Sequence, residues 1–271
     1  MSVLLVLLSD FVEFKSTDER NQDMLTTSTS NRALIFAALM FIGPNIVTAE
    51  PIIAKAANAI QAEFDIVKTE ILQADDAVTF KIAVSGKAGD SKPAASGKLA
   101  GSSVYSYVWP TSLNSSAVGF DADQGILALA VTAHPDFDDT PAADENGDGD
   151  KTNDGNLWHS HWVVLGPDDA CGKGSLKVKD IPNGTKPKLP ATWPGLPLLI
   201  DSPGFEPALS ASTVTVTVPT ATLGDTTGMK FDGVTAALRV NESTHAPLLC
   251  VANVFDIASG DLSLPGTPTK Q

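Results

Sequence analysis

Two histidines separated by a single residue, His159 and His161, carry the clearest chemical signal in this chain of 271 residues. They lie within residues 157–165, where apolar, aromatic and β-branched side chains are typical of a strand. Side chains two apart on a strand project from the same face, with Cα atoms roughly 6.5–7 Å apart, so both imidazoles can reach one ion. The spacing therefore predicts a metal site, for which imidazole favours copper, zinc, iron or nickel.

Further ligands have to come from other segments. Two more histidines occur, His134 and His245, and both are candidates. A single methionine, Met229, follows the N-terminal segment, which argues against a thioether-rich copper site. Trp158 and Trp162 face away from the histidines on a regular strand, so we expect them to pack, unless a bulge turns one over the ion. The alternative is that one imidazole serves the core or surface and its neighbour lies nearby by chance.

An acidic segment comes directly before the histidine strand. Residues 144–149 match the calcium-loop pattern D-x-N-x-D-G, which places oxygen ligands at alternate positions. The twelfth position is Gly155, where an EF-hand has a bidentate glutamate. A calcium site is one interpretation, and a solvated acidic loop that steers cations toward the histidines is the other. The candidate calcium ligands are Asp144, Asn146, Asp148, Asp150 and Asp154.

Catalytic motifs are weak. The chain has no G-x-S-x-G elbow, no phosphate-binding glycine loop and no H-E-x-x-H helix. Ser160 lies between the two histidines but on the opposite face of a regular strand, so it is a poor nucleophile. A hydrolytic metal site would need a general base, and spacing does not select among the candidates, which are Glu206, Glu242 and the cluster Asp136, Asp138 and Asp139.

The elements that must position these residues are predicted to be strands. Short runs rich in Val, Thr, Ile and Leu alternate with Gly, Pro, Asn and Asp turns, a pattern typical of an all-β fold, here an antiparallel β-sandwich with long loops. Residues 50–63 carry apolar side chains at helical spacing and predict one short helix. The predicted strands are 65–72, 77–85, 103–108, 116–120, 125–133, 157–165, 175–179, 213–218, 229–240 and 248–255.

The first 49 residues differ from the rest and are interpreted as a signal peptide region. An apolar run of about ten residues follows a polar stretch, and small residues occupy the positions before Ala49. We expect the true start at Met24 and cleavage after Ala49, with Met1 to Leu8 as a second export or anchor element in the alternative interpretation. Residues 50–271 then form a single β-sandwich metal-binding domain, which the proline-rich segment 182–207 crosses at the surface.

Charge and cysteine content fit an exported protein. The net charge of −14 argues against nucleic acid and anionic membranes as partners. Removing residues 1–49 takes away three basic and five acidic residues and leaves −12, of which −7 lies in residues 136–154. In an oxidising compartment Cys171 and Cys250 are expected to form a disulfide, worth about 4.5 kcal/mol in the chain-entropy model. The alternative makes one thiolate a metal ligand.

The acidic composition, the Trp-His strand and the Asp-Gly-rich loop together resemble the surface-associated copper-binding proteins of methane-oxidising bacteria, the CorA and MopE type. The resemblance covers mainly residues 104–165. It implies a copper(I) ion held by two histidines and by a tryptophan oxidised to kynurenine. Trp158 would be that tryptophan, His161 or His159 one ligand, and His245 the second. The spacing of Trp158 departs from the family, in which the tryptophan lies two residues before a ligand histidine.

Three functions follow from the sequence. The first is an exported copper-binding protein of the periplasm or outer surface of a Gram-negative bacterium, without membrane insertion after cleavage, that serves copper acquisition or storage. Whether it has a redox partner protein is left open. The second is a metal-dependent periplasmic enzyme that uses zinc or copper. The third is a calcium-stabilised module that binds carbohydrate or another surface partner, with Trp109 or Trp193 as stacking platform.

Overall fold

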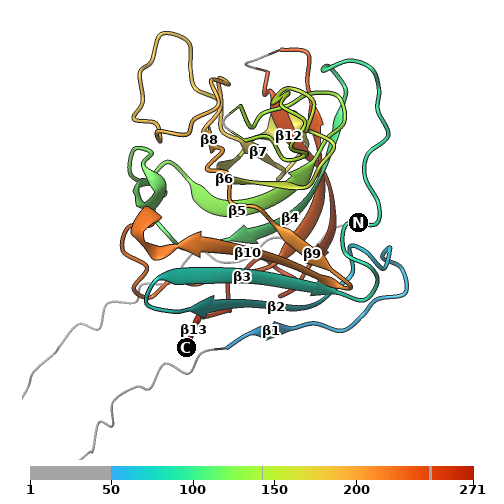
Figure 1. Ribbon diagram of the computed structural model, residues 1–271, viewed down its shortest axis with the longest axis vertical. Helices are drawn as coiled ribbons and strands as arrows, with labels where there is room; N and C mark the ends of the chain where they lie inside the picture. The colour runs from blue at the N-terminus through green and yellow to red at the C-terminus, as the bar shows by residue number, and fades with distance from the viewer. Residues whose placement is uncertain (1–49, 142, 244–245) are drawn as a thin grey trace, which may run out of the picture. The chain divides into compact units, whose positions relative to one another are not determined.

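Two β-sheets make up most of the protein, and nearly all of their strand pairs are antiparallel (Figure 1). The computed structural model describes residues 50–141, 143–243 and 246–271. These residues form one compact unit. The elements are β1 (Ile52–Ile53), β2 (Ile66–Gln73), β3 (Ala77–Val84), β4 (Ser103–Pro110), η1 (Ser115–Val118), β5 (Ile126–Ala133), β6 (His159–Pro167), η2 (Asp169–Cys171), β7 (Leu176–Val178), β8 (Ile200–Asp201), β9 (Ala208–Ser210), β10 (Thr213–Pro219), η3 (Thr220–Thr222), β11 (Val234–Val240), β12 (Leu249–Ile257) and β13 (Thr269–Lys270).

The smaller sheet is open and has the order β1-β2-β3-β10-β9, with β13 pairing parallel to β2. Its centre is the hairpin of β2 and β3, in which Ala74 donates its N–H to the carbonyl of Ala77 to close the turn. Alternation in β3 and β10 buries every second side chain, so this sheet has one covered face.

The larger sheet closes on itself. Its order is β5-β4-β11-β12-β7-β6, and β6 pairs back onto β5 through seven registered residues, which completes a six-stranded barrel (Figure 1). β8 adds to β6 at Trp162 and Val163. The all-β, antiparallel prediction is thus confirmed. The predicted sandwich has two open sheets, whereas the larger sheet here closes into a barrel. Closure removes the free edges that an open sheet would expose.

Strand alternation divides the apolar residues between two cores. On β6, Trp162 and Val164 point outward and pack with the covered face of the open sheet, where Phe80 meets Trp162 edge-on. Val163 and Leu165 point into the barrel and join its own apolar interior. The same division holds on β4 and β5. Because His161 has the parity of Val163, the barrel interior is the face on which the histidines must lie.

Two predicted elements are wrong. Residues 50–63 contain β1 and turns instead of a helix, because Ile52 and Ile53 pair with Thr69 and Lys68 of β2. The strand expected at 116–120 is the 3₁₀ turn η1, whose first turn is capped by the side chain of Asn114. In both cases a pairing or cap outweighs the local pattern. The signal region, with Met24 and Ala49, lies outside the described residues.

A disulfide and the proline-rich segment are attached to the barrel. Cys171 and Cys250 form the predicted disulfide, which ties η2 to β12 with Cα atoms 5.4 Å apart. The proline-rich segment 182–207 stays within the compact unit and contributes β8 and the buried side chains of Leu198 and Leu199. No helix among the described residues has both the length and the apolar character needed to cross a membrane.

Candidate metal centre

Three histidines meet inside one end of the barrel. His159 and His161 belong to β6, where they lie opposite Thr132 and Ala130 of β5. His134 follows directly after β5 and is held by its N–H, which donates to the carbonyl of Gly155 at 2.6 Å. The imidazoles of His159 and His161 share a face, as their spacing predicted, with ring centroids 4.8 Å apart. All three side chains are at most 2% exposed.

A fourth donor, Asp139, completes the cluster. Its Oδ1 atom lies 3.2 Å from Nε2 of each of the three histidines. Nε2 of His134 lies 3.0 Å from Nε2 of His159, and the four ligand atoms all lie within 4.8 Å of one another. Asp139 is 7% exposed, so four polar groups converge in a space closed to solvent. A cluster of this composition is able to hold a metal ion.

The far side of each ring fixes which nitrogen carries the proton. Nδ1 of His134 lies 2.9 Å from the carbonyl of Phe137, and Nδ1 of His159 lies 2.8 Å from the carbonyl of Leu157. A carbonyl only accepts, so both Nδ1 atoms donate. Nδ1 of His161 lies 3.0 Å from the hydroxyl of Ser202, whose proton goes to the carbonyl of Asp139, so this Nδ1 also donates. In their neutral forms all three rings therefore direct an Nε2 lone pair at Asp139.

Facing acceptors of this kind repel one another unless a cation lies between them. Nε2 of His161 and Oδ1 of Asp139 are buried without a hydrogen-bond partner. Nε2 of His159 has the hydroxyl of Thr132 at 3.1 Å as a donor. A metal-bound histidine usually donates its other ring N–H to a carbonyl, a carboxylate or water, which fixes the orientation of the ring. The four atoms therefore form the donor set of a cation site, because they repel one another when no cation lies between them.

Electrostatics keep the carboxylate charged. Burial opposes ionisation of Asp139, but His161 and His134 outweigh it and hold the pKa of this carboxyl well below its usual range. Burial also works against a proton on His134, yet the Asp139 charge prevails and raises the pKa of that ring. For His159 burial dominates and lowers the pKa. The ionised carboxylate and the neutral ring of His159 are the forms that bind metal, whereas at His134 a metal ion has to displace a proton.

The separations also bear on coordination number. Two ligands about 2.1 Å from a common ion lie roughly 3.0 Å apart at a right angle and 3.4 Å apart at the tetrahedral angle. The shortest separation, 3.0 Å, matches the right-angle value, and 3.2 Å lies midway between the two values. These separations fit both a four-coordinate ion and an ion with further ligands.

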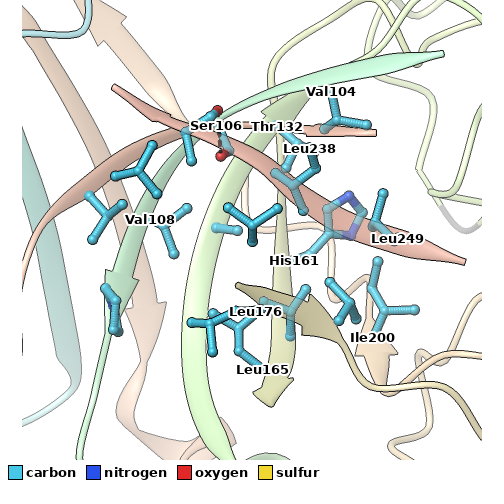
Figure 2. Close-up of a pocket in the computed structure, with 18 of the residues that line it drawn as sticks. Val104, Ser106, Val108, Thr132, His161, Leu165, Leu176, Ile200, Leu238 and Leu249 are labelled. Atoms are coloured by element: carbon cyan, nitrogen blue, oxygen red, sulfur yellow. Dashed lines mark hydrogen bonds between the residues drawn. The ribbon is translucent and has the colours of Figure 1, made fainter. Parts of the chain in front are cut away.

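Two pockets adjoin the cluster. The barrel interior holds an apolar cavity of ≈ 100 Å³ whose lining includes His134, Asp139 and His161. Figure 2 shows the His161 ring in this cavity beside Leu238, Leu249 and Ile200. A second, more polar pocket of ≈ 390 Å³ is lined by His159 on the other side. The cluster therefore lies between an apolar interior and a polar outer pocket.

The other predicted copper residues lie apart from these four or outside the described chain. Trp158 donates its indole N–H to the carbonyl of Gly89 at 3.3 Å and packs on Tyr107, so it has the packing role expected of it. It also lines the polar outer pocket beside His159. His245 lies outside the described residues. The sequence prediction therefore placed three of the four donors and missed Asp139 as a ligand.

The acidic loop is built differently from the histidine cluster. Asp144 accepts the N–H groups of Gly147 and Gly149, and Asp148 accepts that of Asp150. These carboxylates and Asn146 are exposed or half-buried and are used in local turns. Asp154 is 1% exposed, and its Oδ1 atom has no hydrogen-bond partner. Calcium binding by this loop stays a prediction.

Several remaining candidates have structural roles. Trp109 is fully buried in the core between the sheets and cannot serve as a stacking platform for carbohydrate. Asp136 accepts the N–H groups of Ser96 and Gly97, which lower the pKa of its carboxyl. Glu206 lines the polar outer pocket. No family model, curated protein or solved structure matches the chain, so the geometry of its own residues carries the functional argument.

Proposed function

We propose that this is an exported metal-binding protein that holds one divalent transition-metal ion through His134, Asp139, His159 and His161, with copper as the first candidate. The observation that carries the proposal is the convergence of three Nε2 lone pairs and one ionised carboxylate in a buried space. His161 Nε2 and Asp139 Oδ1 lack any hydrogen-bond partner there. A divalent ion satisfies all four donors and offsets the buried negative charge.

Copper follows from the chemistry of the donors. For a given set of nitrogen and oxygen ligands, affinity among the divalent first-row metals rises to a maximum at Cu²⁺. The cluster has no sulfur ligand, since both cysteines form the disulfide. Three imidazoles and a carboxylate suit copper(II) better than copper(I), which prefers soft ligands. The copper(I)–kynurenine arrangement implied by the family resemblance is tested separately, by mass spectrometry of the peptide that contains Trp158.

The polar outer pocket supports a role in acquisition or storage. Its lining includes Asp144, Glu145 and Glu206 around His159. Acidic side chains at the mouth of a pocket raise the local concentration of cations and speed their capture. The negative charge of residues 136–154 would thus serve the centre behind it, with the histidines holding the ion after the carboxylates attract it.

A metal-dependent enzyme is the second candidate. A catalytic metal needs an open coordination position next to a pocket, and both an apolar cavity and a polar pocket adjoin the cluster. Turnover that is lost in the metal-free protein and restored by the metal would favour this candidate over storage. Metal binding without any dependent turnover would favour acquisition or storage.

Metal titration of the double variant His159→Ala/His161→Ala tests the proposal. We expect the full chain, stripped and reloaded with copper(II), to retain one ion after desalting, and the double variant to retain none. The matched control is Asp148→Asn/Asp150→Asn, which removes two acidic charges from the exposed loop and should keep one ion. Unchanged copper content in the histidine variant would overturn the proposal.

A further inference from the structure

The apolar cavity inside the barrel is the feature that the metal site alone does not explain. Side chains from all six barrel strands line it, and these are mainly Val, Ile, Leu and Ala. Figure 2 shows Val108, Leu165 and Leu176 pointing into the same space as His161. A volume of ≈ 100 Å³ is several times what one water molecule needs. The barrel is therefore underfilled, although natural cores are close-packed.

The cavity remains apolar although a few polar side chains line it. Ser106 donates its hydroxyl to the carbonyl of Ala236 at 3.0 Å, and the hydroxyl of Thr132 lies 3.1 Å from His159 Nε2. These hydroxyls are used within the wall. The atoms of the lining that remain without a partner are His161 Nε2 and Asp139 Oδ1, at the metal centre. Away from that end the cavity offers apolar contact only.

We infer that the barrel binds a small apolar molecule, with one end beside the metal centre. Apolar cavities in proteins stay dry and take up apolar guests, and an engineered cavity of roughly 150 Å³ binds benzene or xenon. The present cavity is of that order, which limits the guest to the size of benzene or a short hydrocarbon. The position beside the metal rests on the function proposed above, whereas the cavity itself does not.

The guest has a route to the surface at β12. Val254 belongs to the cavity lining and is 45% exposed, one of the few large apolar side chains open to solvent among the described residues. It lies next to the register irregularity where β12 pairs with Ala236 and Ala237 of β11. Such irregularities interrupt the hydrogen-bond ladder locally, and we place the entry of the guest at this part of the wall. An apolar guest can enter here without passing the acidic pocket.

Benzene binding to the copper-loaded full chain tests the inference. Calorimetry should show one saturable site, and the copper(II) electron paramagnetic resonance spectrum should change as benzene occupies the space beside the metal. Ala236→Leu fills the cavity and should weaken benzene binding at least tenfold while copper content stays at one. The matched control Ala237→Leu changes the next residue of β11, which points out of the barrel and is half-buried, and should leave binding unchanged.

The outcomes separate the cavity from the metal. Absence of benzene binding in protein that holds copper overturns the inference and leaves the proposed function standing. Equal benzene affinity in Ala236→Leu and the wild type overturns it as well. If the protein takes no copper but benzene still binds in a manner that Ala236→Leu blocks, the proposed function fails and with it the metal-adjacent part. Should Ala236→Leu not fold, Val234→Leu adds one methylene to the same cavity and should weaken binding to a smaller extent.

Discussion

The histidine cluster and the acidic loop are adjacent in sequence, and both match a metal-ligand pattern, yet they are built in opposite ways. The cluster places His159 and His161 on β6 and His134 directly after its paired strand β5, and it buries all three. Their Nε2 atoms face the carboxylate of Asp139, which lies in the turn after β5. The loop places its donors on turns, where most of its carboxylates accept N–H groups of the loop itself. Register on a sheet preorganises ligands, whereas a loop has to exchange its internal hydrogen bonds for an ion.

Removing the carboxylate from the cluster should have the largest effect. Asp139→Asn keeps the shape of the side chain but removes the charge that three histidines face, so copper affinity should fall ~100-fold or more, since loss of an outer partner alone typically costs 10–100-fold. Asp148→Asn makes the same chemical change in the loop and should alter copper affinity less than threefold. Competition titration against a copper chelator measures both. Equal losses in the two variants would contradict the placement of the ion at Asp139.

Metal binding should also stabilise the barrel. An ion that binds only the folded protein adds about 2.7 kcal/mol at one hundred times its dissociation constant, which raises the Tm by roughly 5–10 °C in a domain of this size. The increase should vanish in His159→Ala/His161→Ala. Calorimetric scans with and without copper measure it, and an increase that persists in the double variant would contradict the assignment of the site.

The outer hydrogen bonds predict a smaller effect. Ser202 accepts from His161 Nδ1 and donates to the carbonyl of Asp139, so it links two of the proposed ligands. Ser202→Ala should lower copper affinity about tenfold and leave the stoichiometry at one. Ser160→Ala is the matched control, because this serine is equally buried on the histidine strand but bonds the carbonyl of Phe205 on the opposite face. An unchanged copper affinity in Ser202→Ala would mean that Ser202 does not position the ligands.

Calcium should give the smallest effect. If the loop binds calcium, a millimolar concentration should raise the Tm by about 1–2 °C, because its ligands must first give up hydrogen bonds to the loop N–H groups. Asp144→Asn should abolish that increase, and the double histidine variant should retain it. Thermal scans of both variants check this. A large calcium effect that is lost in the double histidine variant would mean that calcium binds at the histidine cluster and not in the loop.

Local patterns in the sequence account for part of this molecule. Alternation predicted that His159 and His161 share a face, and the small number of histidines made His134 a candidate. Asp139 was recognised as part of an acidic cluster but not as a ligand, because its position depends on how the turn after β5 folds back over the barrel end. Three acids within six residues of His134 were the signal available, and spacing could not choose among them.

Local sequence patterns do not predict that the sheet closes into a barrel. Each of its long strands was predicted to within a few residues, but closure depends on β5 pairing with β6 and on β12 reaching β6 through β7, contacts between segments far apart in the chain. The residues at 50–63 failed for the same reason, since the pairing of β1 with β2 overrides their helical spacing. The cavity follows from closure, so it also could not be seen in the sequence.

X-ray absorption spectroscopy of the copper-loaded protein tests the four-residue centre, because it identifies and counts the atoms bound to the ion. The proposed centre predicts three imidazole nitrogens and at least one oxygen at roughly 2.0 Å, with no sulfur. The Asp139→Asn protein, if it is loaded at high copper concentration, should keep the three imidazoles. A spectrum with oxygen ligands alone, or with fewer than three imidazoles, would contradict a centre built from His134, Asp139, His159 and His161.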